Sequence, residues 1–463
     1  MNGYRSPLNP ALKVGTKPRI MNEDINLIKY RAIAIALCTF WAACPACPER
    51  GFGSAPKWTP SPGNPHVSSS FIASIGINTH MGYYDTPYGN SDQIIKELSY
   101  LGISRVRDAA VQIGWEPQFH ALGQAGIKLD LIIGSMASPL STQIRVLRDL
   151  TPYVSSVEGP NEVNLGPVTF NGETGPVAAR AEQKYIYDLV HSSPDLEGMS
   201  VIAFSVAGNI PADYTPYGYN DAFADYGNAH VYFGGGMAPE PQLAKYGHAL
   251  NSALTPGEGT FLTETGYTTS PTGGGNQGVN EFVQAKYTLD VLLDAYKDGY
   301  VQTYLYELID EFADPNDASQ ENHYGLFRND GSAKPAAMAL HDLTNILNAN
   351  CSDAIPLMPD TLHYSVSGLP STGSTYLLVK SNSTFDIMIW NEPPIWLNGS
   401  EIAAPTLPVK VDLGKTFDTV NVFDPMLRTT PVQTLEHVST VQLWITDHPL
   451  IIEASQLVPS IKH

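Results

Sequence analysis

Two glutamates, each close behind a short run of apolar and small residues, are the residues of this chain best suited to chemistry. Glu162 ends the segment Ser156-Val-Glu-Gly-Pro-Asn-Glu162, and Glu264 lies in Phe261-Leu-Thr-Glu-Thr-Gly-Tyr267. Two carboxyl groups that face one substrate can break a glycosidic bond together, one as a proton donor and the other in its ionised form. A single glutamate at a strand end is usually an ordinary loop carboxylate, so this hypothesis requires a fold that brings both together.

The elements that must position these glutamates alternate regularly between residues 70 and 349. Eight strands alternating with eight helices predict an α/β fold, a (β/α)8 TIM barrel. Such barrels carry their chemistry at the C-terminal ends of the strands, and Glu162 and Glu264 end the fourth and seventh strands, on opposite sides of the mouth. The expected strands are 71–78, 104–107, 128–133, 154–158, 200–205, 228–232, 260–263 and 300–306, and the expected helices are 91–101, 116–125, 141–150, 177–191, 220–226, 241–253, 279–297 and 336–347.

The pattern changes after residue 349 to short β-branched or alternating runs, separated by Pro, Gly, Asn and Asp. Such runs are typical of an all-β unit, and we expect residues 350–463 to form a C-terminal β-sandwich. Residues 48–69 are rich in Pro, Gly and Ser and form a linker that could add a strand to this domain. The catalytic barrel is then residues 70–349. The expected strands of the sandwich are 375–380, 385–390, 409–412, 420–423 and 441–445.

The N-terminus, residues 1–47, has the pattern of a targeting segment. Lys29 and Arg31 precede an apolar run from 32 to 43, which ends in small residues. A basic flank followed by about a dozen apolar residues is typical of a secretory signal, and the run is short for a membrane span. We therefore expect an exported protein, periplasmic or secreted, whose mature chain has no integral membrane span. Lipid anchoring at Cys44 is the alternative, since Trp41-Ala-Ala-Cys44 weakly resembles a lipoprotein cleavage box.

Charge and motifs exclude several other classes of function. The formal net charge of −20 argues against nucleic acid and anionic membranes as partners. The chain has no Gly-x-Ser-x-Gly elbow and no His-x-x-x-His pair, so a serine hydrolase and a metal hydrolase are disfavoured. Gly76-Ile-Asn-Thr-His80 after the first strand is not the Gly-rich phosphate turn of a doubly wound sheet. We accordingly expect neither a metal nor a cofactor.

Several segments resemble those of clan A glycoside hydrolases. Glu158-Gly-Pro-Asn-Glu162 is similar to the Asn-Glu signature that ends strand four of that clan, and Thr263-Glu-Thr-Gly266 to the nucleophile site that ends strand seven. His230-Val-Tyr232 on strand six resembles the His-x-Tyr of the same clan. The resemblance covers roughly residues 70–350 and favours families such as 39, 79, 5 or 30. Pro160, where Gly or Trp is commoner, leaves the choice among these families open.

The resemblance implies a role for each matching residue. Glu162 would be the general acid/base and Glu264 the nucleophile of a retaining enzyme. Asn161 would donate a hydrogen bond to the 2-hydroxyl of the sugar, and Tyr232 would hold Glu264. Arg107, at the end of strand two, would keep Glu264 ionised, because a nearby cation favours a carboxylate.

The remaining candidate substrate-binding residues lie near other strand ends: His230 on strand six, His80 after strand one, and Tyr306 and Glu307 after strand eight. His230 could equally be a satisfied core histidine. The sequence thus predicts a retaining glycoside hydrolase that acts on a β-linked poly- or oligosaccharide. The alternative is a carbohydrate-binding or transglycosylating protein built on the same barrel.

Overall fold

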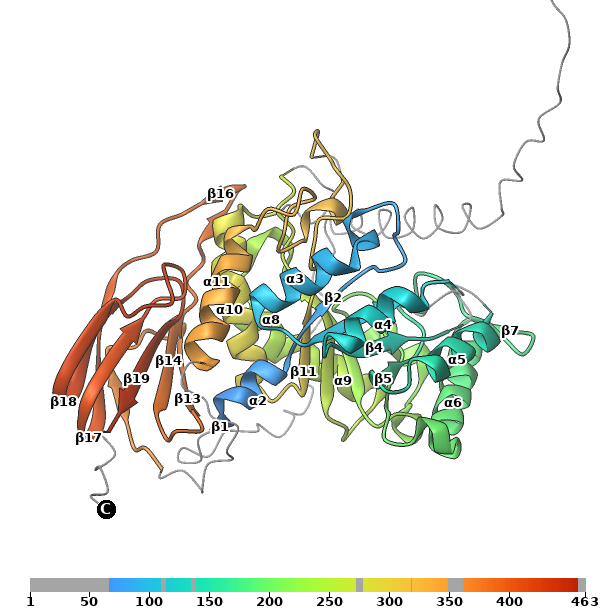
Figure 1. Cartoon of the computed structure of the whole chain (residues 1–463), viewed down its shortest axis with the longest axis horizontal. Coiled ribbons are helices and arrows are strands. Elements are labelled where there is room, and N and C mark those ends of the chain that lie inside the picture. Colours follow the sequence, from blue (N-terminus) through green and yellow to red (C-terminus); the bar gives the residue numbers. More distant parts are fainter. Residues whose placement is uncertain are drawn as a thin grey trace, which may run out of the picture.

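The computed structural model describes residues 66–109, 114–134, 139–271, 278–317, 319–348 and 361–456. The expected targeting segment and nearly all of the expected linker lie outside these residues. Figure 1 shows two parts side by side: a barrel surrounded by helices, coloured blue to yellow, and a C-terminal sheet coloured orange to red. Among the described residues, we find no helix with the length and apolar character that crossing a membrane requires.

The barrel contains eight strands, and every hydrogen-bonded pair of neighbours is parallel. Their order is β8-β5-β4-β3-β2-β11-β10-β9, and a parallel bridge from Ile202 to Tyr226 joins the two ends. The predicted TIM barrel is therefore confirmed. The strands are β2 (Ile75–Asn78), β3 (Arg105–Ala109), β4 (Lys128–Ile132), β5 (Val154–Glu158), β8 (Ser200–Ile202), β9 (Gly227–Tyr232), β10 (Thr260–Gly266) and β11 (Gln302–Leu305).

Helices follow the strands and cover the outside of the barrel (Figure 1). The longer ones are α3 (Ser91–Leu101), α4 (Glu116–Gln124), α5 (Leu140–Asp149), α6 (Pro176–Ser192), α9 (His248–Leu254), α10 (Glu281–Lys297) and α11 (Pro335–Asn348). Short helical and strand segments occupy the connections: α2 (Ser68–Ala73), η1 (Pro87–Gly89), β6 (Thr169–Phe170), β7 (Glu173–Thr174), η2 (Pro194–Leu196), α7 (Pro211–Tyr214), η3 (Thr215–Tyr217), η4 (Asp221–Phe223), η5 (Gly234–Gly236), α8 (Glu240–Gln242), η6 (Leu243–Gly247) and η7 (Glu321–His323).

Three expected strands are too long by three residues or more. One is the eighth, because β11 covers only Gln302–Leu305 of the expected 300–306. The first was expected at 71–78, but Phe71 belongs to helix α2 and only Ile75–Asn78 is a strand. Phe71 is fully buried against the ring of Tyr296, so its apolar character reflects helix packing rather than a strand. The fifth was expected at 200–205, but it ends at Ile202. Beyond that point the backbone N–H of Phe204 donates to the side chain of Gln183, so it is not available to a neighbouring strand.

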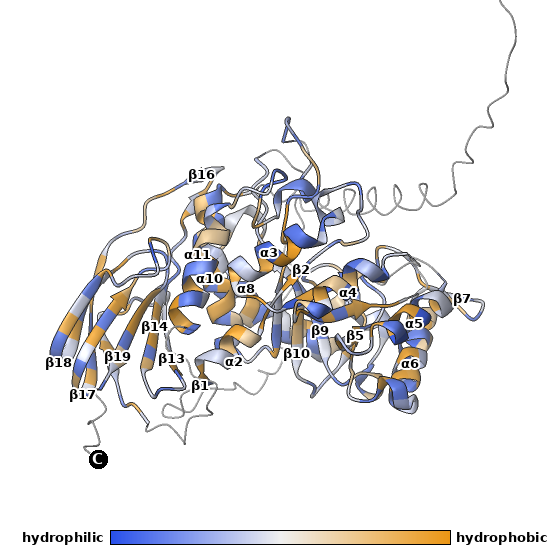
Figure 2. Ribbon diagram, in the orientation of Figure 1, coloured by the Kyte–Doolittle hydropathy of each residue, from blue (hydrophilic) through white to orange (hydrophobic). Residues whose placement is uncertain are grey.

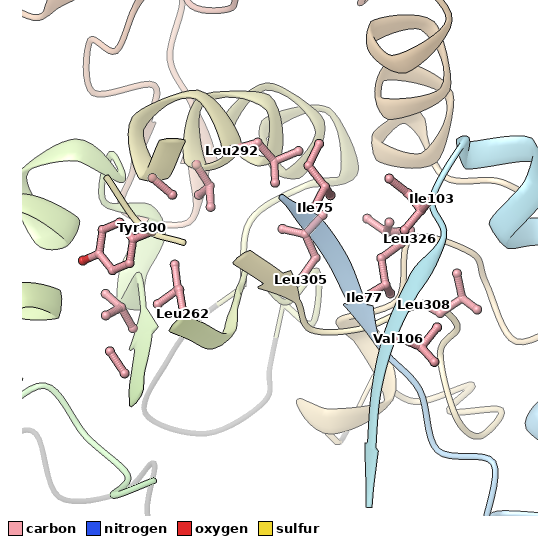
Figure 3. Packing of buried hydrophobic residues seen from close by; sticks show 14 of the residues in the cluster. Ile75, Ile77, Ile103, Val106, Leu262, Leu292, Tyr300, Leu305, Leu308 and Leu326 are labelled. Carbon is pink, nitrogen blue, oxygen red and sulfur yellow. The ribbon is translucent and has the colours of Figure 1, made fainter. Parts of the chain in front are cut away.

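Apolar side chains fill the space between the strands and the helices. Figure 3 shows Ile75 of β2 and Leu305 of β11 packed beside Leu292 of α10. Inside the barrel, Gly76 lies opposite Tyr304, and a Cβ at position 76 would be 2.3 Å from a carbon of the tyrosine ring. Glycine at this position therefore makes room for the aromatic ring that fills the barrel interior.

The C-terminal domain is a β-sandwich with its own hydrophobic core, as predicted. Two strands expected at 409–412 and 420–423 are parts of one strand, β17. Its residues alternate between buried and exposed over much of its length, and Figure 2 shows hydrophobic and hydrophilic residues alternating along it. A central strand at 450–455 was not expected. The strands are β12 (Ser365–Ser367), β13 (Gly373–Val379), β14 (Phe385–Asn391), β15 (Trp396–Leu397), β16 (Ser400–Glu401), β17 (Leu407–Phe423), β18 (Gln433–Ile445) and β19 (Leu450–Ser455), and β1 (His66–Val67) pairs in parallel with β13.

The two domains share a continuous interface along α10. Trp390 of β14 is fully buried, and its indole N–H lies 3.1 Å from both Asp294 Oδ1 of α10 and Glu392 Oε1. The hydroxyl of Tyr287, also on α10, donates to the carbonyl oxygen of Pro393. Apolar residues of both domains belong to one buried cluster. The sandwich therefore packs firmly on the side of the barrel formed by α10.

Candidate active site

The two glutamates meet at the C-terminal end of the barrel. Glu264 lies within β10, where the pairing with both neighbouring strands shifts register, and Glu162 follows β5 after a turn. Glu162 has a φ of +42°, in the left-handed region that few residues other than glycine adopt. Its backbone N–H donates to Ser205 Oγ at 2.9 Å, which helps to hold this turn.

Arg107 of β3 is the buried centre of the site, and its side chain is only 2% exposed. Its Nε and Nη2 donate to both oxygens of Glu158 at 2.6 and 2.7 Å. Its Nη1 lies 2.8 Å from Asn78 Oδ1 and from Glu264 Oε1, and Nη2 also lies 2.8 Å from Asn161 Oδ1. All five N–H groups of the guanidinium thus have acceptors. One cation on β3 therefore orients groups from three other strands, β2, β5 and β10.

Glu264 is surrounded by groups that favour its ionised form. Arg107 donates to Oε1, Tyr232 Oη donates to Oε2 at 2.9 Å, and His230 Nδ1 lies 3.5 Å from Oε2. Burial opposes ionisation, but His230, Arg107 and the Tyr232 hydroxyl outweigh it and hold the pKa of Glu264 below its usual value. A buried carboxylate kept ionised in this way is suited to nucleophilic attack.

Glu162 has a different environment, although it is close by. Its side chain is 24% exposed, against 11% for Glu264, and its charged neighbour is His230, whose Nδ1 lies 3.0 Å from Oε1. One oxygen of each glutamate and a His230 nitrogen all lie within 4.8 Å of one another. The pair therefore faces one small space, with Glu162 on the side open to solvent.

Asn161 uses its side-chain oxygen for hydrogen bonds within the protein. Its Oδ1 accepts from Arg107 Nη2 at 2.8 Å and from the hydroxyl of Ser205 at 3.0 Å. Because a guanidinium only donates, the oxygen must be the atom that faces Arg107. Nδ2 is consequently the part of Asn161 that can donate to a ligand.

The candidates after strands one and eight form a wall beside Glu264. His80 Nε2 lies 3.4 Å from Glu307 Oε2 and 3.5 Å from Glu311 Oε1, and Tyr88 donates to Glu307 Oε2 at 2.9 Å. The ring of Tyr306 packs edge-on against His80 at 5.5 Å. Burial lowers the pKa of His80 to about 4, and burial together with Glu311 raises the pKa of Glu307. The structure thus brings together all nine residues predicted for the site.

Several residues near the pair were not predicted. Glu321 of η7 lies near enough to the pair to be affected by its charge: burial, followed by the charges of Glu162 and Glu264, raises the pKa of Glu321 to about 7. No local sequence signal identifies it, since it lies in a long connection after β11. Asn78 and Thr263 could have been found as polar residues at or near strand ends, where a barrel carries its chemistry.

Among the residues that the structure describes, two groups of side chains have donor atoms close enough for a cation. They are His80 with Glu307 and Glu311, and His230 with Glu162 and Glu264. In the second group, Arg107 and Tyr232 hold the two oxygens of Glu264, and His230 Nδ1 contacts Glu162 Oε1. The first group is part of the wall described above.

Comparisons with known proteins agree with this architecture. No family model matches the chain, and no curated protein matches it in sequence. Among solved structures, a family 39 glycoside hydrolase from Bacteroides cellulosilyticus WH2 superimposes with a TM-score of 0.60 at 14% identity, over 86% of this chain and 83% of that one. A glucosidase from Croceicoccus marinus gives 0.56 at 12% identity, over 86% and 98%. A monomeric β-xylosidase from Caulobacter crescentus gives 0.52 at 14% identity, over 85% and 98%.

These three matches extend over both domains, so this chain shares the barrel and the β-sandwich with these three glycosidases, one of which is a family 39 glycoside hydrolase. At such low identity the similarity shows the fold. What the site does must be argued from its residues.

Proposed function

We propose that this protein is a retaining glycoside hydrolase that cleaves β-linked poly- or oligosaccharides. The observation that carries the proposal is the pair Glu162 and Glu264, with one oxygen of each within 4.8 Å and different surroundings. Retaining enzymes place the two carboxyl groups about 5–5.5 Å apart, whereas inverting enzymes need about 6.5–9.5 Å to admit a water molecule. The short separation supports retention. The shared fold with family 39 glycoside hydrolases supports the same class of reaction.

In the first step, a carboxylate oxygen of Glu264 attacks the anomeric carbon and the bond to the leaving oxygen breaks. Glu162 transfers its proton to that oxygen, so the aglycone leaves as an alcohol. In the second step, Glu162 removes a proton from water, the water oxygen bonds to the anomeric carbon, and Glu264 is released as a carboxylate. Two inversions give net retention.

The surrounding residues support this division of the two roles. Arg107 and Tyr232 donate to Glu264, which favours the charged form that a nucleophile needs. Glu162 is the more exposed of the two and faces the opening, where a leaving group would depart. Asn161 would donate through Nδ2 to a sugar hydroxyl, and His80, Tyr306 and Glu307 would line the sugar site.

The proposal can be tested by comparing the wild type with Glu264→Gln and Glu162→Gln on a panel of β-linked polysaccharides and aryl glycosides. Both variants should lose at least about 10³-fold in turnover, because each removes a group used in the chemical step. Glu173→Gln is a matched control, since Glu173 is exposed on β7 away from the site. Full activity in Glu264→Gln would contradict the proposal.

A second experiment identifies the acid/base residue and the stereochemistry. Azide added to Glu162→Ala should restore turnover of an aryl glycoside and give a glycosyl azide of retained configuration, because azide attacks the glycosyl-enzyme without base catalysis. An azide of inverted configuration would make Glu162 the nucleophile and refute the assignment of roles. Sugar binding without turnover by the wild type would instead indicate a carbohydrate-binding protein, and products longer than the substrate would indicate transglycosylation.

We also propose that the protein is exported, on the basis of the basic and apolar segment near its N-terminus. N-terminal sequencing of the mature protein, together with its recovery from periplasmic and culture fractions, tests this. A lipid attached to Cys44 would be detected by mass spectrometry.

A further inference from the structure

A buried row of hydrogen bonds lies beneath the two glutamates and ends at His230. Asn228 Nδ2 lies 3.0 Å from Glu158 Oε1 and 2.9 Å from the carbonyl oxygen of Ala203. Thr263 Oγ1 lies 2.5 Å from Asn228 Oδ1, and His230 Nε2 lies 3.0 Å from Thr263 Oγ1. Asn228, Thr263 and His230 are at most 1% exposed, so water does not substitute for these partners.

The chemistry of the partners fixes the direction of each hydrogen bond. A carbonyl oxygen and a carboxylate paired with Arg107 can only accept, so the Asn228 atom facing them must be the NH2 group. Its Oδ1 therefore faces Thr263 and must accept. A threonine hydroxyl has one proton, and here that proton is given to Asn228. Thr263 Oγ1 can then only accept from His230, so Nε2 of His230 carries hydrogen.

The other ring nitrogen faces the catalytic pair. With Nε2 protonated, a neutral His230 presents the lone pair of Nδ1 to Glu162 Oε1 at 3.0 Å. A lone pair and an ionised carboxylate repel, so this contact is favourable only when one proton lies between the two atoms. That proton is bonded either to Glu162, which then donates to Nδ1, or to Nδ1 of an imidazolium, which donates to Glu162.

We propose that Thr263 and Asn228 are positioning residues that fix the tautomer of His230, so that Nδ1 and Glu162 together hold the proton delivered to the leaving group. The role of this proton in catalysis rests on the proposed function. The tautomer of His230 does not, because it is a property of the protein without substrate. The opposite tautomer would place Nδ1–H against Glu162 and leave Nε2 and Thr263 Oγ1 facing each other without a proton, which costs a buried hydrogen bond.

The charges around His230 agree with a retained proton. Glu162, Glu264 and Arg107 act on the ring from three other strands or strand ends, while the charge of Glu162 also acts on Glu321 and Tyr214. Burial lowers the pKa of His230, but the two glutamates outweigh burial and the charge of Arg107 and raise it above its usual value. The site therefore favours keeping one proton between His230 and Glu162.

The first experiment measures the tautomer directly by nitrogen NMR on protein labelled with ¹⁵N-histidine, with His230→Gln used to assign the signal. We expect a proton on Nε2 of His230 in the wild type, and a shift toward the Nδ1–H form in Thr263→Val. A wild-type His230 with its proton only on Nδ1 would overturn the proposal. This measurement requires no substrate, so it decides the proposal even if the protein hydrolyses no glycoside.

The second experiment measures the pH dependence of kcat/KM. Thr263→Val should move the alkaline limb of the profile to lower pH by roughly one to two units, because the pair loses its proton more easily without the acceptor for Nε2–H. Thr263→Ser restores the hydroxyl and should restore the wild-type limb. Thr265→Val on the same strand is the matched control, since that buried hydroxyl has no hydrogen-bond partner. A folded Thr263→Val with an unmoved limb would overturn the proposal.

Discussion

The hydroxyl of Tyr232 offers a precise test of how the site keeps Glu264 ionised. Substitution by phenylalanine removes one donor, 2.9 Å from Glu264 Oε2, and keeps the ring. The ring packs edge-on against Tyr324 at 5.6 Å and against Tyr306 at 6.4 Å, contacts that phenylalanine can retain. Arg107 continues to hold the other oxygen of Glu264. The variant therefore changes one interaction with the nucleophile.

The expected magnitude follows from the strength of a hydrogen bond to a charged group, about 1.5–3 kcal/mol. At about 1.36 kcal/mol per pH unit, the pKa of Glu264 should rise by roughly one to two units in Tyr232→Phe. The Tyr232 hydroxyl is among the groups that hold the pKa of Glu264 below its usual value, so removing this hydroxyl should raise that pKa. Since Glu264 must be ionised to attack, the acidic limb of the kcat/KM profile should move to higher pH.

The assay is a pH profile of kcat/KM with an aryl glycoside, alongside thermal unfolding at each pH. Tyr324→Phe is the matched control, because it removes a neighbouring hydroxyl that accepts from the side-chain N–H of Gln320 at 2.8 Å. We expect its acidic limb to coincide with that of the wild type. If Tyr232→Phe is folded and its acidic limb does not move, the hydroxyl does not stabilise the ionised form of Glu264, and our account of the nucleophile is wrong.

Three further predictions concern the cation, the interface and the core. Arg107→Lys should reduce kcat/KM at least about 100-fold, measured by steady-state kinetics, because an ammonium cannot replace five fixed donors. Asp290 is buried on α10 beside Glu392, Asp294 and Asp447, opposed in part by Lys286; burial and these carboxyl groups raise its pKa in the folded protein. The contribution of protonated Asp290 to stability is therefore present in acid and is lost as the pH rises through the raised pKa of Asp290. Asparagine stays neutral at every pH, so Asp290→Asn should raise the Tm at pH 8 more than at pH 5. Ile452→Ala in the sandwich core should lower the free energy of unfolding by about 2–5 kcal/mol in urea titrations, whereas Leu427→Ala, 70% exposed, should change it by about 0.5 kcal/mol or less.

The sequence predicts the fold correctly where the local pattern of apolar residues determines whether a segment forms a strand or a helix. In the barrel, short buried strands alternate with amphipathic or buried helices, and this alternation can be recognised in the sequence. Prediction failed where tertiary packing decides. Phe71 looks like a strand residue, but it packs from a helix against Tyr296. Residues 413–416 look like a break, but β17 continues through them because β18 pairs with it on both sides.

The site could be predicted only in part for the same reason. Glu162 and Glu264 are identifiable because a barrel places its chemistry at strand ends. The importance of Asn228 and Thr263 depends on which atoms they meet across neighbouring strands, and register decides this contact. Thr263 immediately precedes Glu264, yet its hydroxyl points to Asn228 and His230. The spacing of residues along the sequence does not show which side chains the Thr263 hydroxyl contacts.

The structure also explains how two glutamates of the same chemical type can take opposite roles a few ångströms apart. The difference arises from Arg107, whose guanidinium is shared between Glu158 and Glu264 but makes no hydrogen bond to Glu162 among the described residues. Glu158 holds two of its N–H groups, so the cation cannot swing toward Glu162, and its field acts on Glu264. Replacing Glu158 by glutamine should therefore disturb the assignment of roles without touching either catalytic candidate, since Arg107 loses its buried ion pair with Glu158 and is left with Glu264 and the amide oxygens of Asn78 and Asn161. Glu158→Gln should then broaden or displace both limbs of the pH profile, whereas Tyr232→Phe should displace only the acidic one.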